Sequence, residues 1–314
     1  MRLLTTIAER LAGMVLTLLV TSFVIFGALY AAPGSPLSHL VGGRTVTPEQ
    51  IRLVTEQYHL DSPFLERYVL WLRDIFTGDL GTSFVFKQNV LDLIKPRLPL
   101  TLFLVTYAAL LIGVVGLVTG FIAARSKGFV ARSAMLGTTV ALATPSFVAG
   151  VILISLLSVK FPIFPVFGAG EGIFDVLYHL TLPAVAIAVG GVALVARVTR
   201  AAIDEEQSKE FVEAARSRGV RETRTVIRHV VRNALIPIST VLGITVASIL
   251  AQSVVVENVF SLNGLGSLLV SSVQAKDFAV VQAVTLVFVF TFIVVNTIVD
   301  LLYPLIDPRL RALR

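Results

Sequence analysis

The chain has 314 residues, of which 55% are hydrophobic and only 15% are Asp, Glu, Lys or Arg. An ordinary soluble domain carries about 25% charged residues, so the composition excludes that class and predicts a membrane protein. Cysteine is absent, which excludes disulfides, thiolate metal sites and cysteine nucleophiles. The formal net charge of +6 arises from basic residues that crowd next to apolar segments, so it indicates membrane orientation rather than nucleic-acid binding.

Six apolar segments are long enough to cross the hydrocarbon layer, which takes about 20 helical residues. We expect spanning helices at residues 11–32, 98–124, 133–159, 180–200, 235–257 and 278–303. No Asp, Glu, Lys or Arg interrupts the central run of any of them. The first segment is too long and unbroken for a signal peptide, so we expect a retained helix. The sequence therefore predicts an all-α membrane protein with six transmembrane helices.

Basic residues in the short loops predict the orientation. They precede the first segment, separate the second from the third, and follow the fourth and the sixth: Arg2, Arg10, Arg125, Lys127, Arg132, Arg197, Arg200, Arg309, Arg311 and Arg314. The positive-inside rule then places both termini in the cytoplasm. The large first outer loop, residues 33–97, begins with the helix-breaking run Pro33-Gly34-Ser35-Pro36. Within it, Phe64–Phe76 has the spacing of an amphipathic helix that lies on the outer membrane surface or caps the bundle.

A polar island, Asp204–Ala234, lies within the cytoplasmic loop at residues 201–234 and holds seven Lys or Arg and six Asp or Glu. Ser208 is a candidate N-cap of a short helix, and Gly219 is its candidate stop. Phe211, Val212 and Ala215 share one face of that helix, which favours docking in a groove of a partner.

The second part of the island has a different pattern. Apolar residues line one face and arginines the other: Val226, Ile227, Val230, Val231 and Ala234 against Arg221, Arg224, Arg228 and Arg232. This pattern is typical of a helix that enters the membrane with its arginines at the lipid headgroups. An ordinary solvated loop, present only to satisfy membrane orientation, remains the alternative for the whole island.

These residues carry a resemblance to a known family. Glu213-Ala214-Ala215, followed by Gly219 and by Pro237 in the next segment, resembles the EAA motif of binding-protein-dependent ABC importer permeases. The distance from Gly219 to Pro237 resembles that of the dipeptide/oligopeptide/nickel group rather than the sugar importers. Further matching segments are Leu60–Leu72, Gly78–Ser83, Pro96–Leu102, Ala143–Gly150, Glu257–Gly266 and Asp307–Arg309. The long first outer loop is typical of the B-type inner-membrane subunit.

The resemblance implies the type I importer permease fold, with residues 1–314 as one permease domain, in a bacterial cytoplasmic membrane. It implies a coupling helix for a cytoplasmic ATPase, with coupling residues Phe211, Glu213, Ala214, Ala215 and Gly219. The implied partners are a second homologous permease, two ATPase subunits that hold ATP and Mg²⁺, an external solute-binding protein and membrane lipid. The implied solutes are di- or oligopeptides, nickel chelates, glutathione or haem-like ligands.

Other chemistry is poorly supported by the residues. The sequence has no GxxxxGK[ST] phosphate loop, no nucleophile elbow around Ser146 and no metal-ligand spacing among its histidines, so we expect no catalytic, cofactor or metal site. Thr144, Gln252 and Ser253 are neutral polar candidates for a translocation pathway, although packing between helices is the simpler interpretation. Two further alternatives remain: an ion-coupled secondary transporter, which usually keeps an ionisable residue inside a span, and a non-transporting scaffold that recruits a cytosolic partner.

Overall fold

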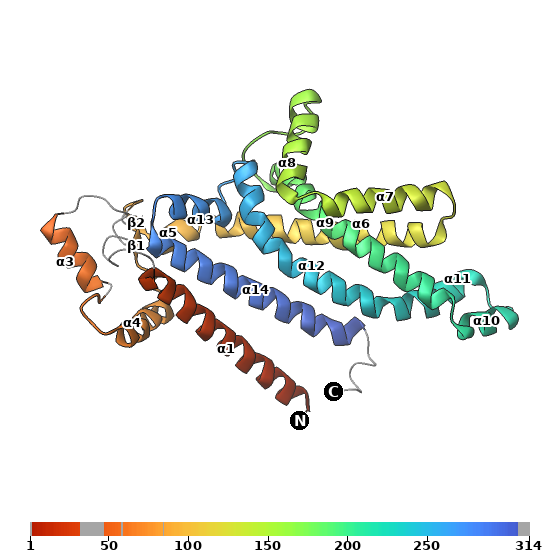
Figure 1. The fold of residues 1–314 in the computed structure, drawn as a ribbon, viewed down its shortest axis with the longest axis horizontal. Coiled ribbons are helices and arrows are strands. Elements are labelled where there is room, and N and C mark those ends of the chain that lie inside the picture. The colour runs from red at the N-terminus through yellow and green to blue at the C-terminus, as the bar shows by residue number, and fades with distance from the viewer. Residues whose placement is uncertain (1, 32–46, 58, 84, 307–314) are drawn as a thin grey trace. The chain divides into compact units, whose positions relative to one another are not determined.

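The computed structural model describes residues 2–31, 47–57, 59–83 and 85–306, and it is mostly helical (Figure 1). In chain order the elements are α1 (Arg2–Ala31), α3 (Pro48–Gln57), α4 (Phe64–Thr77), β1 (Thr82–Ser83), β2 (Gln88–Asn89), α5 (Val90–Ile94), α6 (Leu98–Arg125), α7 (Phe129–Ala143), α8 (Ser146–Ile154), the π-helix η1 (Ser155–Lys160), α9 (Ile173–Gln207), α10 (Glu210–Ser217), α11 (Glu222–Thr225), the π-helix η2 (Val226–Val231), α12 (Arg232–Val259), α13 (Leu265–Gln274) and α14 (Phe278–Ile306). The Pro33–Pro36 run and the Asp307–Arg309 motif lie outside the described residues.

Four helices in the described part are long and apolar enough to cross a membrane: Leu98–Arg125, Ile173–Gln207, Glu222–Val259 and Phe278–Ile298. A bent pair, Ala131–Ala143 with Ser146–Lys160, makes a fifth if it counts as one span. Within α1, the apolar stretch Ala12–Ala28 is shorter than these. Six spans were expected, and the first of them corresponds to α1.

The segment at residues 133–159, expected as one span, bends by 106° between α7 and α8. Thr144 is extended, with φ −91° and ψ 115°, and Pro145 follows it. A proline disfavours helical backbone at the residue before it and cannot donate an amide hydrogen bond, so the series of helical backbone hydrogen bonds is interrupted here. The chain then re-enters a helix at Ser146.

The chain forms two compact units, Met1–Thr101 with Asn263–Val294 and Leu102–Leu262 with Val295–Arg314. In the first unit, α4 packs on α1 through aromatic side chains. The Tyr68 ring lies 5.1 Å from that of Phe23 and 5.6 Å from that of Phe26, and the Tyr68 hydroxyl hydrogen-bonds with Ser22. The expected amphipathic helix at Phe64–Phe76 is therefore present as α4, with its aromatic side against α1.

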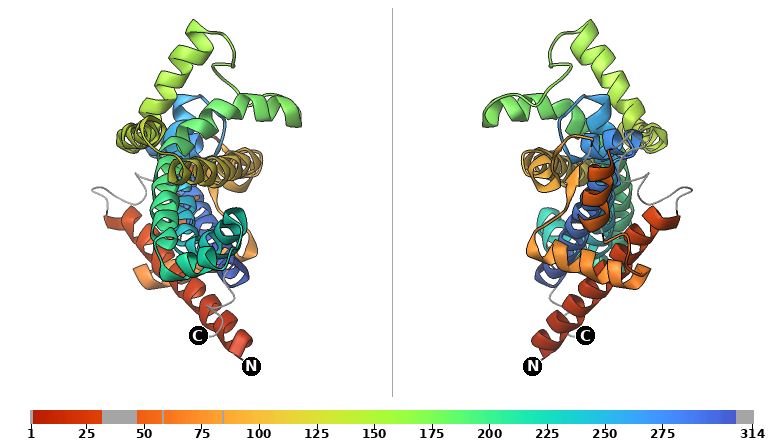
Figure 2. Two further views of the ribbon diagram at one scale, coloured as in Figure 1. Left: turned by 90° about the vertical axis from the view of Figure 1, so that its right-hand side faces the viewer. Right: turned by 90° about the vertical axis from the view of Figure 1, so that its left-hand side faces the viewer.

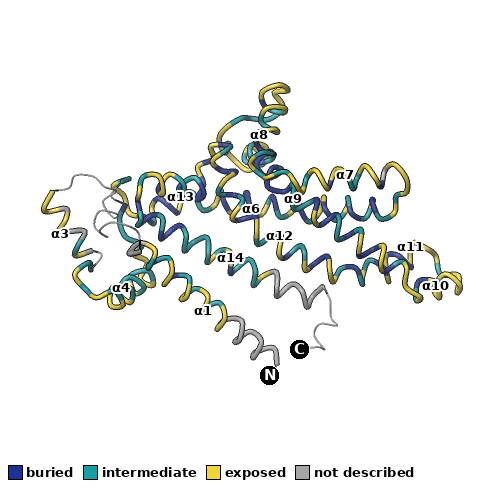
Figure 3. The backbone as a smooth tube through the Cα atoms, in the orientation of Figure 1, coloured by how far each residue is buried: buried dark blue, intermediate teal, exposed yellow. Residues whose placement is uncertain are grey.

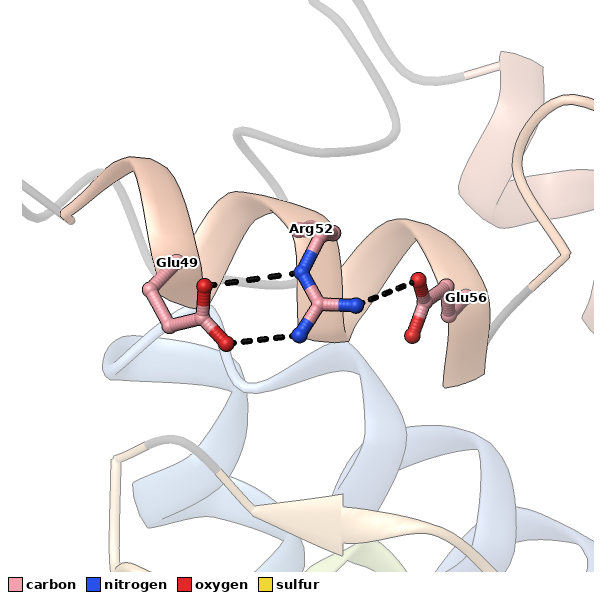
Figure 4. A network of polar contacts seen from close by, with 3 residues as sticks. All are labelled: Glu49, Arg52 and Glu56. Atoms are coloured by element: carbon pink, nitrogen blue, oxygen red, sulfur yellow. Dashed lines mark hydrogen bonds and ion pairs between the residues drawn. The ribbon is translucent and has the colours of Figure 1, made fainter.

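The first unit also contains a separate apolar cluster. Side chains of α5, α13 and α14 form it: Val90, Leu93, Ile94, Leu265, Leu268, Ala279, Val280, Ala283 and Val284. The buried Ser83 hydroxyl donates to the Asp277 carboxylate, which ties the short β1–β2 hairpin to the start of α14. On α3, Arg52 bonds Glu49 and Glu56 along one exposed face (Figure 4). Such pairs one turn apart favour the helical conformation of a short polar segment.

The second unit is built around α9, which packs against α12, α7 and α8. Helix α6 also approaches it closely, because Gly116 and Gly120 lack side chains: a Cβ at Gly116 would lie 2.9 Å from Val195, and one at Gly120 would lie 2.5 Å from Thr199. Small residues at such crossings let two helix backbones meet in a membrane. Buried residues recur along α9 from Leu180 to Glu206 and along α12 (Figure 3).

Candidate functional site

The island connects the ends of two long helices in the second unit, α9 and α12, through α10, α11 and η2 (Figure 1). Figure 2 shows the same connection from two other sides. Helix α9 ends at Gln207, and the Ser208 hydroxyl donates to the Glu205 carbonyl oxygen at 2.7 Å. The prediction that Ser208 caps the next helix is wrong, because Ser208 closes α9 instead. Lys209 occupies the N-cap of α10, without a side-chain cap.

The apolar side of α10 is buried within this chain. Val212 is fully buried and packs with Ala202 and Ile203 of α9 and with Val230, Ala234 and Ile238 of η2 and α12, and Phe211 lies against the same cluster. The buried Val212 is therefore not available as an anchor in a partner's groove, while the coupling role of the half-buried Phe211 stays a prediction. An eight-residue helix is unstable alone, so its apolar side is held by tertiary packing on its own chain.

The polar side of α10 faces outward. Glu213 and Ala214 are exposed, while Ala215 is half-buried. Two of the three motif residues therefore present a surface that a partner can touch, and the buried Val212 fixes the orientation of that surface. Of the five predicted coupling residues, Glu213, Ala214 and Gly219 are exposed, while Phe211 and Ala215 are half-buried.

Gly219 ends α10 with a left-handed turn. Its φ is +71°, its amide donates to the Arg216 carbonyl oxygen at 2.9 Å, and the Val220 amide donates to the Ala215 carbonyl oxygen at 3.1 Å. These two bonds form the Schellman motif, which satisfies the last carbonyl groups of a helix. Arg216 then binds both carboxylate oxygens of Glu222 across the turn, at 2.7 and 3.0 Å. This hydrogen bonding raises the pKa of the Arg216 guanidinium.

Glu206 joins three elements of the island. It is the last buried residue of α9, with 12% of its side chain exposed. One carboxylate oxygen accepts a bond from the Asn233 amide in α12 at 3.1 Å, and the other accepts from Lys209 at the start of α10. The hydrogen bond to Glu206 raises the pKa of the Lys209 ammonium. This polar junction was missed in the sequence, where Glu206 looked like one of many loop charges.

A concave pocket of about 760 Å³ lies between α10 and the start of α12. Its lining combines Phe211, Ala214 and Arg218 of α10 and its C-cap with Arg228, His229 and Arg232 from η2 and the start of α12. Two arginines that were expected at lipid headgroups, Arg228 and Arg232, thus line this pocket. The expected apolar face is also incomplete, since Ile227 is 62% exposed while Val226 and Val230 are buried.

The candidate pathway residues occupy two different elements. Thr144 follows α7, and its hydroxyl donates to the Val140 carbonyl oxygen. Ser253 in α12 is fully buried, and its hydroxyl donates to the Leu250 carbonyl oxygen of the same helix. Gln252 is half-buried and reaches Ser248 at 3.4 Å. Ser253 is therefore buried inside this chain, and the assignment of the three residues to a pathway stays a prediction.

Comparisons with known proteins agree on one class. A family model described as "Binding-protein-dependent transport system inner membrane component" matches residues 116–312, and the corresponding N-terminal model matches residues 3–105. The glutathione transport system permease protein GsiC of Escherichia coli (strain K12) is 34% identical over 310 residues, which cover 98% of this chain and 99% of that protein. The dipeptide transport system permease protein DppB of Lactococcus lactis subsp. cremoris is 33% identical over 311 residues, covering 97% and 98%.

Among solved structures, a chain of the MetNI methionine ABC transporter in inward facing conformations has a similar fold. The TM-score is 0.55 at 17% sequence identity, and the match covers 69% of this chain and 97% of that chain. This identity is low enough that the match establishes the fold alone.

Proposed function

This chain belongs to the family of binding-protein-dependent transport system inner membrane components, and we propose that it is the permease subunit through which an ATP-driven importer moves peptides or similar small solutes into the cell. The family resemblance and the permease fold expected from the sequence are confirmed by the comparisons. The observation that carries the proposed mechanism is the placement of α10. Its apolar side is packed on two spanning helices, while Glu213 and Ala214 stay exposed.

We infer that α10 is the coupling helix. Val212 contacts residues of α9, η2 and α12 at once, and Glu206 adds a polar link between α9, Lys209 and Asn233. A force applied to the exposed side of α10 is therefore delivered to two spanning helices together. Transmission of this kind requires a packed element with two discrete arrangements rather than a flexible loop. The Schellman turn at Gly219 and the Arg216–Glu222 pair supply that rigidity.

Energy and selection are assigned to other subunits. The sequence lacks the phosphate-binding loop, so ATP and Mg²⁺ would be held by two cytoplasmic ATPase subunits that contact Glu213 and Ala214. A second homologous permease would complete the pathway in the bacterial inner membrane, and an external solute-binding protein would deliver the solute. Relatives are named for glutathione and for dipeptides, which supports a peptide-like solute here.

The test is transport by the reconstituted complex. The chain is co-expressed with its ATPases and second permease, purified through a tag on this chain, and placed in liposomes with a solute-binding protein and labelled di- and oligopeptides. We expect ATP-dependent uptake, and we expect Glu213→Lys to remove it together with copurification of the ATPase. Glu171→Lys is the matched control, since Glu171 is exposed between η1 and α9, outside the island.

Three results would contradict the proposal. ATP-dependent uptake and ATPase recovery that survive Glu213→Lys would reject α10 as the coupling helix. Flux driven by an ion gradient in liposomes that hold only this chain would establish a secondary transporter. Copurification with an ATPase but no peptide flux in the complete complex would favour the scaffold alternative.

A further inference from the structure

A second cavity of the second unit shares no lining residue with the pocket beside α10. It lies where α6 ends at Arg125 and the chain turns into α7, and its volume is about 640 Å³. Its lining includes the cations Lys127, Arg132 and Arg200 together with Met135, Leu136 and Thr139. Because α6 is apolar throughout and ends here, this cavity opens at the boundary between hydrocarbon and water.

The frame of the cavity is held by neighbouring contacts. Gly128, with φ +65°, turns the chain sharply into α7. Arg197 of α9 donates to the hydroxyls of Thr138 and Thr139 in α7, and these two hydrogen bonds join the helices beside the cavity. Arg200 follows Arg197 by one turn of α9 and so lies near the mouth of the cavity. Arg132 and Arg200 therefore come from two helices that are joined, and Lys127 lies in the short turn between α6 and α7.

The charge around the cavity is strongly positive. Lys127 and Arg132 are exposed. Arg200 forms an ion pair with Asp204 at 3.4 Å, and among the described residues Asp204 is the acidic group paired with these cations. Three cations against one carboxylate attract an anion, and arginine and lysine together favour a phosphate group.

The apolar surface next to the cavity distinguishes a phospholipid from a free phosphate ion as its ligand. Phe129, Leu136 and Val140 are 84%, 69% and 68% exposed, and they share the face of α7 that carries Arg132. This stripe leads from the cations along α7, and two of its members, Leu136 and Val140, follow Arg132 by one and two turns. A free phosphate ion would use only the cations, whereas a phospholipid would use both surfaces.

We propose that this cavity binds the phosphate headgroup of an anionic phospholipid, held by Lys127, Arg132 and Arg200, with an acyl chain along Leu136 and Val140. Basic pockets between spanning helices recognise anionic lipid headgroups by this chemistry. The proposal does not depend on the solute that the importer carries or on the role of α10.

The experiment is native mass spectrometry of the full chain in its complex, delipidated in mild detergent and titrated with phosphatidylglycerol or with zwitterionic phosphatidylcholine. We expect phosphatidylglycerol to be retained at least tenfold more strongly, and we expect Lys127→Gln with Arg132→Gln to abolish that preference. Arg221→Gln with Arg224→Gln, which removes two exposed charges outside the cavity, should leave the preference intact.

Several outcomes would overturn the proposal. Equal retention of the two lipids, or an unchanged preference in the Lys127/Arg132 variant, would exclude a headgroup site here. Displacement of phosphatidylglycerol by millimolar inorganic phosphate would indicate a phosphate-ion site. If the double variant does not fold, photoactivatable phosphatidylglycerol on the unmodified complex decides: labelling at residues 126–140 supports the site, while labelling elsewhere, or none there, rejects it.

Discussion

At the scale of single residues, the turn after α10 depends on one backbone conformation. Gly219 has φ +71°, and a Cβ added there would meet nothing within 4 Å, so strain rather than space limits substitution. A left-handed conformation costs about 1–2 kcal/mol for an ordinary L-residue, and Asn tolerates it best. We expect Gly219→Val to reduce ATP-coupled uptake more than tenfold and Gly219→Asn to retain most of it, measured in liposomes. Equal activity of the two variants would contradict the role of this turn.

The Glu206 junction gives a second prediction at the same scale. Replacing Glu206 with Ala leaves the half-buried Asn233 amide without its acceptor, and a lost buried partner costs about 1–3 kcal/mol. We expect a lower midpoint of thermal unfolding for the purified protein in detergent, together with weaker coupling of ATP hydrolysis to uptake. Glu205→Ala is the matched control, since the Glu205 side chain is 74% exposed and lies 3.8 Å from Lys209. An equal loss of stability in both variants would mean that the junction is not specific.

These two residues differ in how well the sequence reveals them. Gly219 was predicted as a helix stop, because glycine readily adopts the left-handed backbone conformation that ends a helix. Ser208 was assigned to the wrong helix, because a hydroxyl can close one helix as well as cap the next, and the choice depends on where α9 ends. The role of Glu206 depends on Asn233, a distant residue, so no local pattern could have shown it.

At the scale of elements, the crossing of α6 and α9 requires glycine. A Cβ at Gly120 would lie 2.6 Å from the Ala196 carbonyl oxygen, whereas a Cβ at Gly113 on the same helix would meet nothing within 4 Å. We expect Gly120→Leu to separate the two helices and to abolish folding or assembly, while Gly113→Leu is tolerated. Size-exclusion chromatography and membrane yield measure this difference. Comparable yields of both variants would contradict the packing.

The sequence predicted where the apolar helices lie, but it did not predict where one of them is interrupted. Apolar runs predicted the regions of α6, α9, α12 and α14, because a helix that crosses the hydrocarbon layer needs about 20 mostly apolar residues, which are visible in the sequence. The α7–α8 bend was not anticipated although Pro145 was visible, since prolines inside spans are often tolerated, as Pro183 and Pro237 are in α9 and α12. Helix α9 also begins at Ile173 rather than near residue 180, because the helix continues through Asp175 and His179, which had ended the uncharged run in the sequence.

At the scale of the whole molecule, the family could be inferred from ordered motifs that each carry little information alone. Their spacing across the chain pointed to a permease, and the matches over residues 3–105 and 116–312 bear this out. The direction in which α10 faces could not be inferred in this way. Its apolar residues fit both a partner's groove and the chain's own helices, and only the packing of Val212 against α9, η2 and α12 separates the two.

The absence of Asp, Glu, Lys and Arg from the six central apolar runs leads to a prediction about energy supply. Ion-coupled transporters usually carry an ionisable group inside a span, because the coupling ion must bind there despite the cost. We therefore expect uptake by the complete complex in liposomes to follow internal ATP and to change less than twofold when an ionophore collapses the proton and sodium gradients. Complexes with an ATPase-inactivated partner should show no uptake at any gradient. Uptake that falls in proportion to the gradient at constant ATP would require an ion site in the membrane and would overturn this account of how the permease is driven.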